Sequence, residues 1–203
     1  MTEQRKRMIV GLTGASGAVY GVRLVEVLLQ ADYEVHLVVS PAGHQVLEYE
    51  MGIAGEAALQ DALLSKANSG KLILHRHENI AAAIASGSFQ TEGMVVSPCS
   101  MGTLAAIAQG LAQNLLTRSA DVCLKERRPL ILIVRETPLH AIHLENMLKL
   151  SRMGAVILPA MPAFYQHPRT IGDLVDFITG RTLDSLKIPH ALYERYDGMG
   201  TDD

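Results

Sequence analysis

The chain lacks several features that would assign a protein class at once. Its 203 residues include no tryptophan, only two cysteines, and 4% aromatic residues. Cys99 and Cys123 are too few for a disulfide framework and lack metal-ligand spacing. No apolar run approaches the roughly 18–20 residues of a membrane helix, and the polar start does not resemble a secretory signal. We therefore expect a cytoplasmic protein without a metal site, in which any ring-binding pocket relies on Tyr, Phe, Met and aliphatic side chains.

The net charge of −3 is small. It argues against a surface built for nucleic acid or for an acidic membrane. The length suits one domain with a proper core. We expect a single domain over 1–203, with the core at about 8–186 and the C-terminal segment as a lid or tail.

Strand-like apolar runs alternate with segments of helical spacing. Strands are expected at 8–13, 34–40, 71–75, 93–97, 130–134 and 155–158. Helices are expected at 18–30, 41–50, 56–66, 101–126 (broken near Gly110), 138–153 and 171–186. This alternation, with strands apolar throughout, predicts an α/β fold: a Rossmann-like (flavodoxin-like) parallel sheet with helices on both faces.

One helix has well-marked ends. Thr137 followed by Pro138 is typical of an N-cap residue before proline in the first helical position, and Gly154 is typical of the residue beyond a helix. The pair Arg135-Glu136 is therefore expected at the carboxyl end of a strand, just before a helix.

The stretch 8–21, MIVGLTGASGAVYG, runs from a strand through a small-residue turn into a helix. Unpaired N–H groups at such a helix start favour an anion, and we interpret the turn as a phosphate cradle. The spacing GxxGxxG differs from the dinucleotide pattern GxGxxG. An ordinary βα turn that uses glycine for its backbone freedom is the alternative.

Small, hydroxyl and charged residues also follow the other expected strands. Ligands of open α/β sheets bind beyond the carboxyl ends of the strands, so these residues are predicted to share one edge. Any single Ser or Thr there is explained by helix capping, but four such turns together predict a phosphorylated ligand. The residues are Gly14, Ala15, Ser16, Ser40, Ser100, Met101, Gly102, Thr103, Arg135 and Tyr165.

Arg118 and Lys125 lie seven residues apart on one helical pattern, and so on one face. With Arg135 and Arg181 they are candidates for a second anion pocket, because the guanidinium fork suits phosphate. Glu50 and Glu136 are candidate acid–base groups, and Cys99 is interpreted as a packed thiol rather than a nucleophile. His140 and His143 have helical spacing but no third ligand, which favours a surface or capping role.

Several segments together resemble the UbiX-type flavin prenyltransferases (UbiX/Pad family). The similarity covers about residues 8–196. Its most specific parts are LKERRPLILIVRETP and the PAFY motif. The other matching segments are GLTGASGAVYGVRL, SPCSMGTLAAIAQG, HLENMLKLSRMGAVILPAM and DLVDFITGRTLD.

This resemblance implies a Rossmann-like homo-oligomer, a dodecamer with flavin sites at subunit contacts. It implies a metal-independent transferase that joins reduced FMN to dimethylallyl monophosphate, giving prenylated FMN and phosphate. The product would serve UbiD-type decarboxylases, as in ubiquinone biosynthesis.

The resemblance also assigns residues to roles. FMN-binding positions are Gly14, Ala15, Ser16, Ser40, Ser100, Met101, Gly102, Thr103 and Arg135. Catalytic positions are Ser16, Glu50, Arg118, Lys125 and Glu136. Substrate positions are Arg118, Lys125, Tyr165, Arg181 and Tyr196, the last standing where many relatives carry a tryptophan.

These residue types suit allyl transfer, in which phosphate leaves an allylic cation that must be kept from water. Loss of the flavin C6 proton requires a base, for which we expect Glu136 working with Ser16. Two alternatives remain at this point. One is an FMN-dependent cysteine decarboxylase of the related fold, although the chain lacks the Pro-Ala-Ser-Ala-Asn-Thr run of those enzymes. The other is a non-catalytic flavin carrier for a decarboxylase.

Overall fold

The computed structural model describes residues 5–67 and 70–196, which form two compact units separated between Ala160 and Met161. The first contains every strand: β1 (Arg7–Leu12), β2 (Glu34–Val39), β3 (Lys71–His75), β4 (Met94–Cys99), β5 (Leu130–Val134) and β6 (Val156–Ile157). Its helices are α1 (Ala18–Gln30), α2 (Pro41–Met51), α3 (Gly55–Leu64), η1 (Ala83–Ala85), α4 (Met101–Ala108), α5 (Leu115–Lys125) and α6 (Ala141–Arg152).

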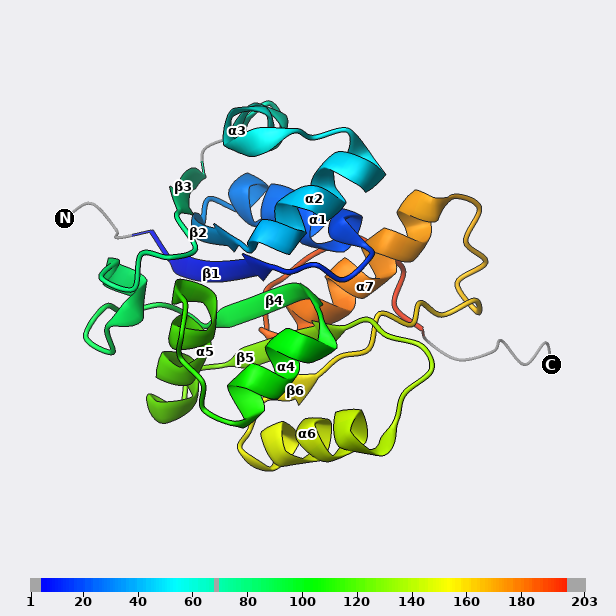
Figure 1. Cartoon of the computed structure of the whole chain (residues 1–203). Coiled ribbons are helices and arrows are strands. Elements are labelled where there is room, and N and C mark those ends of the chain that lie inside the picture. The colour runs from blue at the N-terminus through cyan, green and yellow to red at the C-terminus, as the bar shows by residue number, and fades with distance from the viewer. Residues whose placement is uncertain (1–4, 68–69, 197–203) are drawn as a thin grey trace. The chain divides into compact units, whose positions relative to one another are not determined.

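The six strands form one parallel sheet in the order β3-β2-β1-β4-β5-β6 (Figure 1). This is the strand order of the Rossmann fold, in which the chain starts in the middle and winds outward in both directions. The predicted fold class is confirmed. β1 lies at the centre, so the turns after β1 and β4 meet where the winding direction reverses.

Both faces of this sheet are covered, as the continuous apolar strands predict. Ile9, Val96 and Leu132 are fully buried in a cluster with Leu116 and Cys123 of α5. Successive strand residues point to opposite faces, so the alternate set faces α1. There a β-carbon on Gly21 would lie 2.9 Å from Cγ of Leu12 and 2.2 Å from the carbonyl oxygen of Ser97.

The helix boundaries expected from the sequence agree with the structure to within two residues, except at the start of one helix. The expected break near Gly110 is present, because α4 ends at Ala108 and Gly110 has φ 69°. The expectation that Thr137 caps a helix beginning at Pro138 is wrong. α6 begins at Ala141 with His140 as its N-cap, and the Thr137–Pro138 peptide is cis. A Thr-Pro pair fits a turn as well as a helix start, since proline fixes only φ.

The second unit contains α7 (Ile171–Ser185) and the chain around it. Thr170 and Asp173 form a capping box at the start of α7, in which each side chain accepts from the other residue's backbone N–H. The single domain and its lid remain predictions. Residues 197–203 of the expected C-terminal tail lie outside the described residues. Among the helices described, none is long and apolar enough to cross a membrane.

Candidate active site

The turn after β1 brings Glu50 to the start of α1. Gly17, at φ 103°, supplies the N-cap position of α1 without a side-chain cap. The Glu50 carboxylate, from the end of α2, takes that role. It accepts the N–H groups of Gly17 at 2.9 Å and of Ala18 at 3.0 Å. Glu50 is therefore the anion that caps this helix start, a contact that the sequence did not predict.

The charge state of Glu50 follows from these contacts. Partial burial alone would raise the pKa of this carboxyl group. Hydrogen bonds from the Ser16 hydroxyl and the backbone N–H groups of Gly17 and Ala18, together with the charge of Arg135, lower the pKa below its usual value. Glu50 is thus held as an anion beside Ser16. The sequence suggested Glu136 as the partner of Ser16, but the carboxylate that Ser16 contacts is Glu50.

Arg135 follows β5 directly and is exposed at the same edge of the sheet. Its charge acts on both Glu50 and Tyr20. The pKa of Tyr20 is nevertheless raised, because burial outweighs the nearby arginine. Tyr20 was missed from the sequence, although it lies on the first turn of α1 beyond the glycine turn. Glu136 is exposed, and its Oε1 accepts the N–H of Thr137 at 3.1 Å.

Ser40 and Ser100 occupy equivalent positions after β2 and β4. Each is an N-cap: Ser40 Oγ accepts from Gly43 N–H at 3.0 Å, and Ser100 Oγ accepts from Thr103 N–H at 3.3 Å. α2 and α4 therefore both begin at the edge that carries Ser16 and Arg135. Helix capping, the alternative explanation for a single hydroxyl at this edge, therefore applies to both serines.

Thr13 is a second residue of this edge that the sequence did not mark. Its buried hydroxyl donates to the Pro98 carbonyl at 2.7 Å and accepts the Ser100 N–H at 2.8 Å. It therefore holds the turn after β4 against the end of β1. The available signal was a hydroxyl directly after a buried apolar strand, a position where few groups can pair with it.

The remaining FMN-binding candidates also lie at this edge. Ala15 and Met101 are buried, whereas Gly14 and Gly102 are exposed. A β-carbon on Gly14 would lie 2.5 Å from that of Ala42, so only glycine permits this close approach of the turn to α2. A β-carbon on Gly102 would meet nothing within 4 Å, which leaves open space beside the first turn of α4.

Of Arg118 and Lys125, Lys125 lies away from this edge within one chain. Both lie on α5, as predicted, but α5 runs back toward the starts of the strands and Lys125 ends it just before β5 (Figure 1). Lys125 pairs with Glu126. Arg118 donates from Nε to the Ala85 carbonyl at 3.2 Å and pairs with Asp121 at 2.8 Å. A strand of five residues spans about 17 Å, so Lys125 lies at the edge opposite to Ser16.

The second unit contains the other three substrate candidates. Tyr165 and Tyr196 pack edge to face with ring centroids 5.6 Å apart, and more than half of each side chain is exposed. Arg181, on the last turns of α7, is half-exposed and pairs with Asp184 at 3.3 Å. These contacts connect Tyr165 to Tyr196, and they give Arg181 an orienting carboxylate.

The residues that were assigned no chemistry behave as packing or surface groups. Cys99 is fully buried, and burial raises the pKa of its thiol to about 12, so it is a packed thiol as predicted. His140 and His143 stack with ring centroids 3.5 Å apart at the start of α6. Within residues 5–67 and 70–196, no group of three or more His, Cys, Asp or Glu side chains could hold a metal ion.

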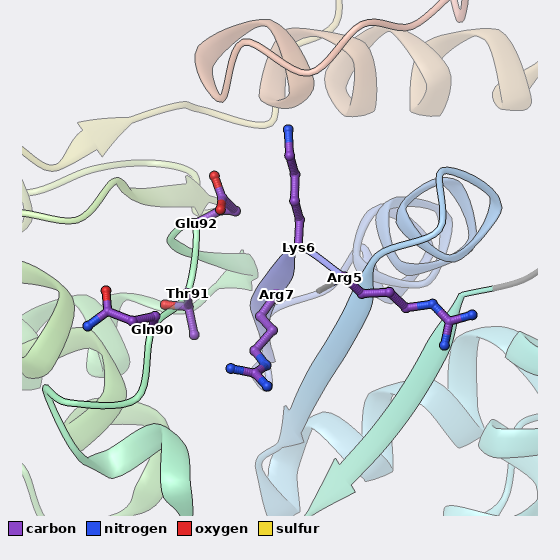
Figure 2. A pocket seen from close by; sticks show the side chains of 6 residues that line it. All are labelled: Arg5, Lys6, Arg7, Gln90, Thr91 and Glu92. Carbon is purple, nitrogen blue, oxygen red and sulfur yellow. The ribbon is translucent and has the colours of Figure 1, made fainter. Parts of the chain in front are cut away.

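A separate hollow of about 200 Å³ lies at the starts of β1 and β4, lined by Arg5, Lys6, Arg7, Gln90, Thr91 and Glu92 (Figure 2). Its cations do not converge. Lys6 and Arg7 point in opposite directions in Figure 2. Arg5 pairs with Asp32 at 2.9 Å, and Arg7 pairs with Glu34 at 3.0 Å. We assign this hollow no ligand.

Comparison with known proteins decides the family. The sequence model of the Flavoprotein family matches residues 1–183. The flavin prenyltransferase UbiX of Halalkalibacterium halodurans is 52% identical over 198 residues, covering 97% of this chain and 96% of the relative. The chain belongs to the UbiX flavin prenyltransferases. This confirms the resemblance that the motifs indicated.

Two solved structures of this family align over nearly all of the chain. The crystal structure of AnUbiX (PadA1) in complex with FMN and dimethylallyl pyrophosphate has a TM-score of 0.88 and 42% identity, covering 97% of this chain and all of that one. The dodecameric FMN-dependent UbiX-like decarboxylase from Escherichia coli O157:H7 has a TM-score of 0.85 and 44% identity, covering 95% and 100%. UbiX structures thus share the fold described above.

Proposed function

We propose that this chain is a flavin prenyltransferase, which joins the dimethylallyl group of dimethylallyl monophosphate to N5 and C6 of reduced FMN and releases phosphate. The observation that carries the proposal is the 52% identity to a flavin prenyltransferase over 97% of the chain. We expect the product, prenylated FMN, to serve a UbiD-type decarboxylase. A non-catalytic flavin carrier would not need the Ser16–Glu50 pair, and the identity favours prenyl transfer over cysteine decarboxylation.

The carboxyl edge of the sheet suits the flavin phosphate. α2 and α4 begin there, so their first-turn N–H groups bring partial positive charge to the same edge as Arg135. The open space beside Gly102 permits close approach to the start of α4. We assign FMN binding to Gly14, Ala15, Ser16, Ser40, Ser100, Met101, Gly102, Thr103 and Arg135. Bound reduced FMN supplies the electron-rich N5 and then C6 for the two new carbon bonds.

We assign proton transfer at this edge to Ser16, Glu50 and Glu136. The Ser16 hydroxyl is a hydrogen-bond donor to an anionic Glu50, which orients it and raises its ability to accept a proton in turn. Glu136 is exposed at the end of β5 and is unpaired with Ser16. We assign Glu136 to accept the proton lost from C6, and Ser16 with Glu50 to hold and relay a proton beside it.

The prenyl phosphate requires cations and a hydroxyl donor. Tyr165 and Arg181 of the second unit supply these, and Tyr196 covers Tyr165. Lys125 lies at the end of α5 opposite to the carboxyl edge of the sheet, whereas Arg118 lies on the first turn of α5 and its guanidinium contacts Ala85 and Asp121. We therefore propose that Arg118 and Lys125 act on the site of a neighbouring copy in a homo-oligomer, a dodecamer as in the Escherichia coli relative.

The surface of α6 supports assembly with further copies. Ile142, Leu144 and Leu148 are each more than half exposed on this helix, and Met153 directly after it is also exposed. Single exposed apolar residues are ordinary, but several on one short helix are typical of an interaction surface. We assign the exposed apolar residues of α6 to contacts between copies of the chain.

Anaerobic incubation with reduced FMN and dimethylallyl monophosphate tests the proposal. We expect mass spectrometry to detect a flavin that has gained one five-carbon unit. Glu136→Gln should still bind FMN but slow adduct maturation, and Ser16→Ala should slow turnover. Bound, reduced flavin that gains no carbon would refute the transferase. Normal turnover of Glu136→Gln or Ser16→Ala would instead remove that residue from the relay.

A further inference from the structure

One carboxylate in the second unit gathers four donors. Asp184, near the end of α7, accepts from Arg195 Nη2 at 2.8 Å and from His190 Nε2 at 3.1 Å on Oδ1. Its Oδ2 accepts from Arg181 Nη1 at 3.3 Å and from the Tyr193 hydroxyl. Three of these donors come from the segment after α7, and the fourth is a predicted substrate residue. Asp184 itself is mostly buried.

The hydrogen bonds fix the form of His190. The Leu192 N–H donates to His190 Nδ1 at 3.2 Å, so Nδ1 carries no proton and Nε2 must be the donor to Asp184. Neutral His190 therefore bridges the backbone of the segment to the carboxylate. The His190 side chain is only 3% exposed, so its hydrogen bond to Asp184 is shielded from solvent.

The segment after α7 also packs directly against the helix backbone. A β-carbon on Gly180 would lie 2.5 Å from the Tyr193 ring and 2.8 Å from the His190 ring. Glycine at this position lets both rings reach α7 one residue before Arg181. The seating of the segment is thus supported by packing, independently of the hydrogen bonds to Asp184.

An unbroken row of rings leads from this contact to the predicted substrate tyrosines. His190 packs on Tyr193 (5.3 Å between centroids), Tyr193 on Phe177 (5.2 Å), Phe177 on Tyr165 (6.1 Å) and Tyr165 on Tyr196 (5.6 Å). Tyr165 and Tyr196 are therefore connected to Asp184 through packed rings, while Arg181 is connected to it by an ion pair.

We propose that Asp184 is a positioning residue for prenyl-phosphate binding: it orients Arg181 and fastens the segment 186–196 onto α7, so that Tyr165 and Tyr196 are held ready. This rests on the proposed function, which assigns Tyr165, Arg181 and Tyr196 to the prenyl phosphate. Asp184 does not touch the reacting atoms. Its effect is on affinity for the phosphorylated substrate, with FMN binding unaffected.

Asp184→Asn is the informative variant, because it keeps the shape but places an NH₂ group where two donors converge. The matched control is Asp173→Asn, which removes a carboxylate from the capping box of the same helix. Arg195→Gln removes the exposed donor to Asp184. We expect it to change the affinity for phosphate by about twofold or less. Tyr193→Phe removes one donor outside the helix and tests the proposal if Asp184→Asn does not fold.

Three measurements are compared: backbone hydrogen exchange of 186–196, affinity for inorganic phosphate and for dimethylallyl monophosphate with oxidised FMN bound, and kcat and KM. For Asp184→Asn we expect faster exchange in 186–196 and a roughly 10–100-fold loss of affinity for both phosphates, the range for a hydrogen bond to a charged group. KM should rise similarly, with kcat and the FMN Kd changed about twofold or less. Tyr193→Phe should change in the same direction by less, and Asp173→Asn should leave the phosphate affinity unchanged.

The proposal would be overturned if Asp184→Asn exchanged residues 186–196 at the wild-type rate or bound phosphate with wild-type affinity. It would also be overturned if Asp173→Asn lost as much phosphate affinity as Asp184→Asn. The exchange and inorganic-phosphate measurements do not depend on turnover. A wild-type protein that makes no adduct would refute the proposed function, while these two measurements would still decide the role of Asp184. An active wild type with unchanged KM in Asp184→Asn would refute only the positioning role.

Discussion

The carboxylate of Glu50 at the start of α1 allows a quantitative prediction. It accepts two backbone N–H groups at 2.9 and 3.0 Å, a role that an N-cap side chain fills in other helices. Loss of a cap costs about 1 kcal/mol, and the charge at a helix N-terminus adds about 0.3–1 kcal/mol. Glu50 is exposed, so solvent screens the charge and the lower part of that range applies.

We therefore expect Glu50→Ala to lower the free energy of unfolding by about 1–2 kcal/mol. Glu50→Gln keeps one acceptor oxygen and should cost about half as much. For a chain of this length, 1 kcal/mol corresponds to a Tm shift of about 2–4 °C. Glu48→Gln is the control, since Glu48 is exposed on the same helix and its substitution should change stability by less than about 0.5 kcal/mol.

The pH dependence gives this prediction a sign. The folded pKa of Glu50 is lowered, so its contribution is present above the unfolded pKa of about 4.3 and is lost as the pH falls through the folded value. The difference in Tm between wild type and Glu50→Gln should be full at pH 7 and shrink below about pH 4. Equal melting of Glu50→Gln and wild type at pH 7, or an undiminished difference at pH 3, would refute the reasoning.

Three further predictions follow from single contacts. Thr13→Val should lower the free energy of unfolding in urea by about 2–4 kcal/mol, because the Ser100 N–H and Pro98 carbonyl lose their buried partner; Thr13→Ser should recover most of it, and a Val variant as stable as wild type would contradict this. Gly180→Ala should make 186–196 more sensitive to proteolysis despite the higher helix propensity of alanine, because the new β-carbon meets the Tyr193 ring; unchanged protection would show that the segment is not seated there. Lys125→Ala and Glu136→Gln, each strongly slowed alone, should regain about a quarter of wild-type activity in mixed oligomers, since some sites then combine intact residues from two copies; no recovery would place both residues in one chain's site.

The regular elements could be predicted because the patterns that define them are local. β3, β5 and α1 have the expected boundaries, since apolar runs and 3.6-residue spacing are read within one segment. The start of α6 could not be predicted in this way, because Thr137-Pro138 satisfies two local rules and the choice between them depends on the surrounding fold. Gly154, with φ 95°, does lie just past α6 as predicted.

The site was predicted less fully, because its pairings are long-range. Glu50 reaches Gly17 across 33 positions of sequence, so the spacing within the glycine turn carried no sign of its anion. The joint placement of Arg118 and Lys125 on one helix was correct. The separation of Lys125 from Arg135 followed from the direction of α5, which returns to the start of β5, and connectivity alone would have indicated this.

The most direct test of the central claim is the stoichiometry of one wild-type turnover. Protein loaded with reduced FMN is mixed without oxygen with dimethylallyl monophosphate, and both flavin mass and released phosphate are followed. We predict one phosphate released for each flavin that gains a five-carbon unit. Flavin of unchanged mass, or phosphate released as a five-carbon alcohol forms instead of the adduct, would contradict flavin prenyl transfer.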